Sequence, residues 1–294
     1  MLNAIYNLFK GERHIKEVSK SFSSYLAPAL VNQLIENPAS LKLEGENRNM
    51  TFLFTDIEGF TSFTETTEAT LLVDVLNEYL DQACQIIMDS GGTIDKMIGD
   101  AVVAIYNAPL EIEDHPERAV RTALALDEFC MAFMRRKNEA GMAMGITRIG
   151  INTGDAVVGN FGGENRFDYT VIGDAVNTAA RLESVNKYLG TRICVSGATA
   201  ERCPNLHFRP VATLLLKGKT QGVDVFEPLT GERFRSEGVQ QYLEIYPSLE
   251  AGGTDCLPGL ERLADDYPDD PVLRLHRDRL RAGESGVRIV LDEK

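Results

Sequence analysis

Two aspartates, Asp56 and Asp100, have the residue type and setting that point most directly to chemistry. Asp56 follows an apolar run, Met50–Thr55, that is typical of a buried strand. Asp100 stands in a Gly-Asp pair between two further apolar runs, Thr93–Ile98 and Ala101–Tyr106, which predict a β-hairpin with a tight turn. A core strand that ends in Asp beside this hairpin would place two carboxylates side by side.

Two adjacent carboxylates repel each other, so that one pKa rises or both groups share a cation. Oxygen-rich sites of this kind suit Mg²⁺ or Mn²⁺, which keep several waters and also bind substrate phosphates. Each aspartate has an ordinary alternative, Asp56 as the cap of the following turn and Asp100 as a simple turn residue. The presence of both aspartates, one at the end of a core strand and one in the adjacent hairpin turn, favours a metal site.

The segments around these aspartates resemble a known family. FTDIEGFT followed by KMIGD is similar to the class III nucleotidyl cyclase catalytic domain, the adenylyl/guanylyl cyclase homology domain. The similarity continues through RIGINTGDAVVGNFG, YTVIGDAVNTAARLE and LKGK, and covers about residues 48–229. Each motif is moderately specific, and their order and spacing together are strongly so.

The resemblance implies a two-metal reaction. Asp56 and Asp100 would bridge two Mg²⁺ or Mn²⁺ ions per site, and the backbone carbonyl of Ile57 would complete one coordination sphere. Two metal ions about 4 Å apart polarise both the attacking ribose 3′-hydroxyl and the leaving pyrophosphate. No His or Lys near Asp56 resembles a dedicated base, so lowering of the hydroxyl pKa by the metal is expected to suffice.

The resemblance also assigns two contacts to the purine. Lys96, four residues before Asp100, would hydrogen-bond the base, and the second contact falls at Thr170 in FDYTVIGD, whereas Asp168 is not the matching position. A hydroxyl can accept from the adenine amino group, so Lys96 with Thr170 favours ATP over GTP. Many adenylyl cyclases carry Asp at this position, and Thr resembles the subgroup that is often stimulated by bicarbonate.

Ribose and phosphate contacts are expected from a helix after Gly173-Asp174, where Asp174 is predicted as the N-cap. Asn177 and Arg181 lie at i and i+4 and therefore share one face. Arg presents a fixed charge and planar donors that match phosphate oxygens, so these two are the predicted catalytic residues. Lys217 in LKGK fits the lysine that steadies the triphosphate, with Lys219 as the alternative.

Class III sites form between two subunits, and the resemblance extends this to the present chain. One subunit would supply the metal ligands and the other would supply Lys96, Thr170, Asn177 and Arg181. Because the chain carries both sets, we expect a head-to-tail homodimer with two equivalent sites and an inactive monomer.

The elements that must position these residues alternate in a recognisable order. Apolar residues at helical spacing predict one helix around 71–87 and another over Pro116–Asn138, and a second hairpin is expected from Thr147–Asn152 and Ala156–Phe161 around Thr-Gly-Asp. The order β-α-β-β-α-β indicates an α+β, ferredoxin-like fold. Extra strands are expected near 192–195, 207–216 and 223–226.

The chain is expected to have three parts. Residues 1–48 are predicted as a helical linker and residues 49–230 as the catalytic domain. Residues 234–294 are predicted as a tail of two short helices separated by DDYPDDP, similar to a degenerate tetratricopeptide hairpin, which docks on its own domain or on a partner.

Bulk composition excludes several classes of protein. The net charge of −14 argues against a nucleic-acid binder, which normally carries a basic face. Five scattered cysteines without CxxC spacing indicate free thiols in a reducing compartment. No apolar run approaches the ~18 residues that a membrane helix needs. A cytoplasmic location is expected, either for a soluble protein or for the cytoplasmic part of a membrane receptor.

The combined prediction is an adenylate cyclase that converts ATP to cyclic AMP and pyrophosphate. Two alternatives stay open, a guanylate cyclase and a non-catalytic module that senses a nucleotide or bicarbonate. A diguanylate cyclase is disfavoured because its GG[DE]EF signature is absent.

Overall fold

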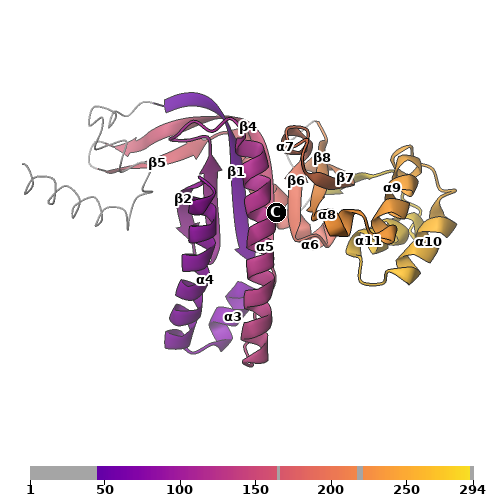
Figure 1. The fold of residues 1–294 in the computed structure, drawn as a ribbon, viewed down its shortest axis with the longest axis horizontal. Helices are drawn as coiled ribbons and strands as arrows, with labels where there is room; N and C mark the ends of the chain where they lie inside the picture. Colours follow the sequence, from indigo (N-terminus) through magenta and orange to yellow (C-terminus); the bar gives the residue numbers. More distant parts are fainter. Residues whose placement is uncertain (1–44, 164–165, 217–220, 292–294) are drawn as a thin grey trace, which may run out of the picture.

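A nine-stranded sheet organises the part of the chain that the structure describes. The computed structural model describes residues 45–163, 166–216 and 221–291. Within these residues the strand order is β2-β3-β1-β4-β6-β8-β7-β9, and β5 pairs with β4 off this path. In Figure 1 the β4–β5 arm lies at one end of the molecule and the C-terminal helices at the other.

The first half of the sheet has the predicted ferredoxin-like topology. Strands β4, β1, β3 and β2 are neighbours in that order, and each pair is antiparallel. Helices α4 and α5 lie next to each other across these strands, with the short helix α3 near their far ends (Figure 1). The elements are β1 (Gly45–Ile57), α3 (Phe60–Thr66), α4 (Ala69–Asp89), β2 (Thr93–Ile98), β3 (Ala101–Tyr106), α5 (His115–Glu139) and β4 (Thr147–Gly163).

Helical periodicity explains how α4 packs on this sheet. Its buried residues recur every fourth position, at Val75, Tyr79, Ala83 and Ile87, so one stripe faces the core. The helix ends where Gly91 adopts a φ of +87°, a left-handed conformation that favours glycine. The prediction of this helix from apolar spacing is confirmed.

The expected second hairpin is wrong. Residues 147–163 form one continuous strand, β4, because β1 pairs with it from Ile57↔Thr147 to Gly45↔Gly159 without interruption. Gly154 is not a turn residue: a Cβ there would lie 2.8 Å from the Cβ of Ala175 in the next helix. The Thr-Gly-Asp signal therefore reflects close helix–strand packing. The hairpin instead joins β4 to β5 (Arg166–Ile172).

The predicted extra strands are present. Strand β6 pairs in parallel with β4 and antiparallel with β8, and β8 forms an antiparallel hairpin with β7. The elements of this half are α6 (Asp174–Leu189), β6 (Ile193–Ser196), α7 (Gly197–Ala200), β7 (His207–Leu216) and β8 (Val223–Leu229).

The C-terminal region differs from the predicted pair of helices. It contains α8 (Gly231–Phe234), α9 (Glu237–Glu250), α10 (Leu257–Asp266), α11 (Pro271–Arg281) and a strand, β9 (Arg288–Leu291). The first predicted helix is divided into α9 and α10 by a turn at Gly252, whose φ is +78°. Strand β9 pairs in parallel with β7 and so extends the main sheet.

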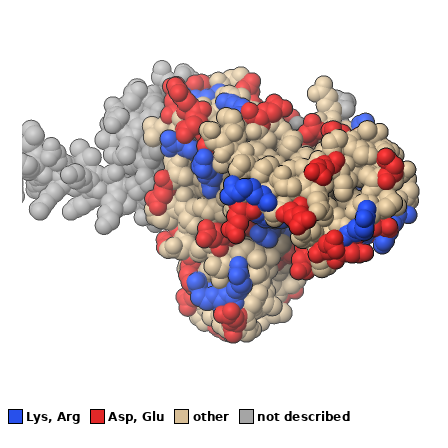
Figure 2. Space-filling view, turned by 45° about the vertical axis from the view of Figure 1, so that its right-hand side comes forward, with Lys and Arg blue, Asp and Glu red and all other residues tan. Residues whose placement is uncertain are grey.

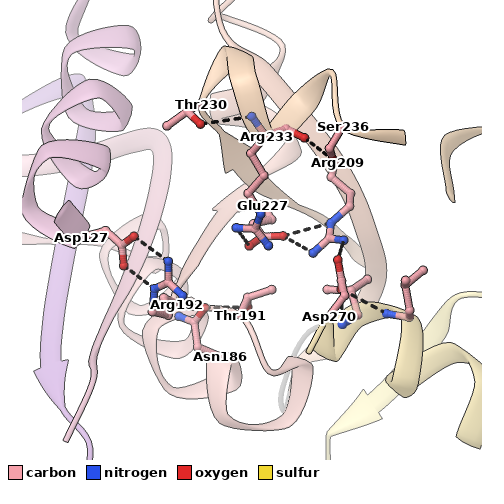
Figure 3. A network of polar contacts seen from close by, with 12 residues as sticks. Asp127, Asn186, Thr191, Arg192, Arg209, Glu227, Thr230, Arg233, Ser236 and Asp270 are labelled. Carbon is pink, nitrogen blue, oxygen red and sulfur yellow. Dashed lines mark hydrogen bonds and ion pairs between the residues drawn. The ribbon is translucent and has the colours of Figure 1, made fainter. Parts of the chain in front are cut away.

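This region packs against the rest of its own chain, which was one of the two arrangements expected from the sequence. A single hydrophobic cluster combines residues from α6, β7 and the C-terminal helices, among them Leu182, Leu189, Leu214, Tyr242, Leu260 and Leu273. A polar network joins the same parts (Figure 3). In it Arg209 of β7, with 0% of its side chain exposed, contacts Glu227 of β8 and Asp270, whose oxygen lies 2.5 Å from Arg209 Nη1.

Three further expectations concern the chain as a whole. The predicted linker falls mainly outside the described residues, and the strand β1 already begins at Gly45 within the range 1–48. All five cysteines are free. None of the helices in the described part of the chain has the combined length and hydrophobicity of a membrane span.

On the face shown in Figure 2, acidic and basic side chains are interspersed.

Candidate functional site

The two predicted metal ligands meet at the end of β1. Asp56 occupies the second-last position of that strand, and Asp100 follows Gly99, whose φ of +63° makes the tight β2–β3 turn. The backbone N–H of Ile57 donates to Asp100 Oδ2 at 2.7 Å. This hydrogen bond holds the turn against β1, so the fold brings Asp56, Ile57 and Asp100 together.

The electrostatics of this corner are those of crowded carboxylates. Burial and the charge of Asp100 raise the pKa of Asp56 to about 6, although Arg148 opposes the shift. Burial also raises the pKa of Asp100, whereas the hydrogen bond from Ile57 lowers it. A carboxylate pair that resists ionisation in this way is one that a cation would stabilise.

A third acidic residue, Glu183 on α6, was not predicted for this site. Burial, followed by the charge of Asp56, raises its pKa to about 7, and Asp100 contributes in the same direction. Its Oε1 atom is buried and has no hydrogen-bond partner among the described residues. Gly150 of β4 permits this approach, since a Cβ there would lie 2.1 Å from the backbone nitrogen of Glu183. No sequence motif marks Glu183, because its approach to Gly150 exists only once α6 packs on β4.

Arg148 is the second residue that the sequence interpretation missed. It pairs directly with Asp56 across β1 and β4, and its guanidinium forms an ion pair with Glu58. Its Nε atom is buried and has no partner among the described residues. Arg148 is therefore a fixed positive charge beside the acidic cluster, in a position that register alone could have revealed.

These residues fit a divalent cation. Oxygen ligands from the two aspartate carboxylates and a backbone carbonyl match the preferences of Mg²⁺ and Mn²⁺. The raised pKa values of Asp56 and Glu183 show that the carboxyl groups of this cluster lack sufficient positive charge to offset their repulsion and burial. A bound cation would supply that charge.

The predicted purine contacts form a second group. Lys96 Nζ of β2 donates to Thr170 Oγ1 of β5 at 3.1 Å, although 74 positions separate the two residues. The side chain of Lys96 is 47% exposed. The fold thus brings together a charged donor and a hydroxyl at a surface that a base can reach.

The predicted catalytic pair lies on α6. This helix begins at Asp174 with Gly173 as its N-cap, so the assignment of Asp174 as the cap is wrong by one residue. Asn177 is exposed and Arg181 is half-buried, one turn further along the same face. Lys217 and Lys219 lie outside the described residues.

Comparison with known proteins identifies a family and several relatives to which this chain is similar. Residues 44–227 match the family described as "Adenylate and Guanylate cyclase catalytic domain". Adenylate cyclase 1 of Rhizobium meliloti (strain 1021) is 38% identical over 208 residues, which cover 70% of this chain and 31% of the relative. The adenylate cyclase of Anabaena cylindrica is 33% identical over 218 residues, or 71% of this chain and 41% of the relative. The chain thus spans less than half the length of these relatives.

Solved structures give the same family. The adenylyl cyclase CyaB from P. aeruginosa superposes with a TM-score of 0.60 at 33% identity, covering 65% of this chain and 98% of that one. The guanylyl cyclase Cya2 superposes with a TM-score of 0.59 at 32% identity, covering 66% of this chain and 98% of that one.

Proposed function

This chain belongs to the adenylate and guanylate cyclase catalytic domain family, and we propose that it converts ATP to 3′,5′-cyclic AMP and pyrophosphate. The observation that carries the proposal is the carboxylate pair Asp56 and Asp100, which the 2.7 Å hydrogen bond from Ile57 holds at one corner of the family scaffold. Relatives named adenylate cyclase support the choice of reaction.

Asp56, Asp100 and the carbonyl oxygen of Ile57 would hold Mg²⁺ or Mn²⁺ ions, two per site. When bound, these ions lower the pKa of the ribose 3′-hydroxyl and offset the charge of the leaving pyrophosphate. Arg148 contributes a positive charge that is available to phosphate oxygens. Its contact with Glu58 keeps that charge at the end of β1.

Lys96 and Thr170 bind the adenine. Lys96 donates to a ring nitrogen, and the Thr170 hydroxyl accepts from the exocyclic amino group. Their 3.1 Å contact supports a joint role, because the two groups already lie close enough to engage one base edge.

Asn177 and Arg181 orient the ribose and stabilise charge on the α-phosphate as the 3′-oxygen attacks. A fixed guanidinium stabilises developing negative charge without reorganisation at the moment of reaction. Lys217 would steady the triphosphate. We assign the metal ligands and this second set to different subunits of a homodimer, so that two equivalent sites form.

Product analysis tests the proposal. Purified protein is incubated with ATP or GTP and Mn²⁺, with and without bicarbonate, and the cyclic nucleotides are quantified. We expect cyclic AMP from ATP in clear excess over cyclic GMP from GTP. A bicarbonate response would add a regulatory role for Thr170. Absence of any cyclic product would refute the reaction and favour a sensor module.

One alternative has a specific observation in its favour. The solved guanylyl cyclase Cya2 is nearly as similar to this chain as CyaB is. Guanylate cyclase activity would be established by turnover of GTP equal to or above that of ATP.

A further inference from the structure

Strand β2 contains a bulge immediately before the purine-contacting lysine. Ile94 pairs with Ala104 and Lys96 pairs with Val103, so Asp95 has no partner of its own in the ladder. Consecutive residues of a regular strand point to opposite faces, whereas a bulge redirects a side chain and is common beside active sites. Here Lys96 Nζ lies 3.2 Å from Asp95 Oδ2, so the bulge places both side chains on the same side.

The side chain of Asp95 lies beneath the contact between Lys96 and Thr170. Its side chain is 2% exposed, against 47% for Lys96, and its Oδ1 atom has no hydrogen-bond partner among the described residues. The Thr170 side chain also acts on this carboxylate and favours its charged form. Burial raises the pKa of Asp95, and the contacts with Thr170 and Lys96 act in the opposite direction, toward the charged form. A buried carboxylate with an unpartnered oxygen thus lies beside Lys96, which itself contacts Thr170.

The hydrogen-bond capacities of these three groups leave a defined pattern for a ligand. A hydroxyl has one proton and two lone pairs, and an ammonium group has three protons. Thr170 accepts from Lys96, so its proton is free to turn to the buried Asp95 Oδ1, which has no partner among the described residues, and this leaves one lone pair. Lys96 contacts Asp95 and Thr170, which leaves one proton. The pair therefore presents one donor and one acceptor.

We propose that Asp95 is a specificity-determining residue that fixes the Thr170 hydroxyl as a hydrogen-bond acceptor and so makes the site select adenine over guanine. Adenine offers an acceptor at N1 and a donor at N6, which complement Lys96 and Thr170. Guanine offers a donor at N1 and an acceptor at O6, which is the reverse pattern. Thr170 alone could rotate to suit either base, and the buried carboxylate removes that freedom. This inference rests on the proposed function, because it concerns the same nucleotide site.

The test is the substitution Asp95→Asn, which keeps the shape but supplies an amide that can donate as well as accept. The readout is the ratio of kcat/KM for ATP to kcat/KM for GTP. We expect the ratio to fall about tenfold, the equivalent of about one hydrogen bond. The matched control is Asp168→Asn, which removes the same charge from an exposed residue of β5 two positions from Thr170 and should leave the ratio within about twofold.

A second variant tests whether Asp95 acts on base selection through Thr170 or independently of it. In a Thr170→Val background there is no hydroxyl to orient, so adding Asp95→Asn should not change the ratio further. A further fall in the double variant, or an unchanged ratio in Asp95→Asn alone, would overturn the inference. If Asp95→Asn does not fold, Asp95→Ser, which is smaller and neutral, carries the same expectation.

Measurements of nucleotide binding test this inference separately from the proposed reaction. Affinities for 3′-deoxy-ATP and 3′-deoxy-GTP, which lack the attacking hydroxyl, are measured for the intact protein and for each variant. Preference for the adenine nucleotide that is lost in Asp95→Asn supports the inference even if no cyclic product forms, in which case only the reaction fails. An intact protein that binds neither nucleotide overturns both.

Discussion

At the scale of single residues, the acidic corner at the end of β1 concentrates charge that the chain does not neutralise by itself. Asp56, Asp100 and Glu183 all have pKa values raised by burial, and Arg148 is the positive charge that opposes the shifts of Asp56 and Glu183. Such an arrangement costs stability in the absence of a cation and gains it when a cation binds.

The metal assignment predicts the effect of neutralising either aspartate. We expect Asp56→Asn and Asp100→Asn each to reduce cyclic nucleotide formation by more than about 100-fold, because even residues that only support a metal ligand typically contribute 10–100-fold. The thermal midpoint of unfolding without metal should not fall. Asp74→Asn, at an exposed position of α4, is the control and should keep full activity. Substantial turnover in either site variant would remove the assignment.

His276 on α11 predicts how stability depends on pH. Burial lowers its pKa from the ordinary 6.5 to about 4, and its ring N–H donates to the Val211 carbonyl at 2.9 Å. The unfolded chain therefore binds a proton that the folded chain does not, and stability falls as pH decreases from 6.5 toward 4. Each pKa unit corresponds to about 1.4 kcal/mol, so the loss is on the order of 3 kcal/mol.

Urea unfolding at pH 6.5, 5.5 and 4.5 measures this loss. His276→Gln retains a donor for Val211 but does not titrate, and should show a weaker pH dependence than the natural chain. His115 also has a pKa lowered to about 4 and stays in both proteins, so the difference between them isolates His276. Identical pH profiles would contradict the prediction.

At the scale of elements, the C-terminal helices are part of the folded domain. Strand β9 extends the sheet beside β7, and Asp270 caps the start of α11 through the backbone N–H groups of Val272 and Leu273. The same carboxylate contacts the buried Arg209 (Figure 3). One network therefore fixes both the β7–β8 hairpin and the entry to α11.

Arg209 is predicted to stabilise this junction strongly. Arg209→Met would leave the buried Glu227 and the partly buried Asp270 without their main partner, and we expect a loss of about 3–5 kcal/mol in the free energy of unfolding. Arg233→Met is the matched control. Arg233 also contacts Glu227, at 2.9 Å, but its side chain is 40% exposed, so its loss should cost no more than about 1 kcal/mol. Equal effects in denaturant unfolding would argue against a buried network.

At the scale of the whole molecule, the interactions among the described residues divide the predicted site into two groups. Asp56 and Asp100 interact electrostatically with each other, and Lys96 bonds to Thr170. A site shared between two subunits would join the first group of one copy to the second group of the other.

Mixing two inactive variants tests the shared site. Asp56→Ala lacks a metal ligand and Arg181→Ala lacks the phosphate-contacting residue, so each homodimer should be inactive. A heterodimer has one site with both defects and one intact site, and co-expression should restore part of the activity. The measurement is cyclic AMP formation after tandem-tag purification of the heterodimer. No recovery in that heterodimer would show that each site is built within one subunit.

Much of the fold followed from local sequence. Helix α4, the β2–β3 hairpin and the three later strands were predicted because apolar periodicity and turn residues act over short distances. Asp56, Asp100, Lys96 and Thr170 were singled out by motifs whose order along the chain is itself local information.

Long-range contacts decided the remainder. The Thr-Gly-Asp segment of β4 became a continuous strand because β1 offered a partner along its whole length. Residues Arg288–Leu291 became strand β9 because β7 presented a free edge. Arg148, Glu183 and Asp95 owe their positions to strand register, helix packing and a bulge, respectively. Each of these depends on residues distant in sequence that meet only when the chain folds, so no local pattern could reveal them.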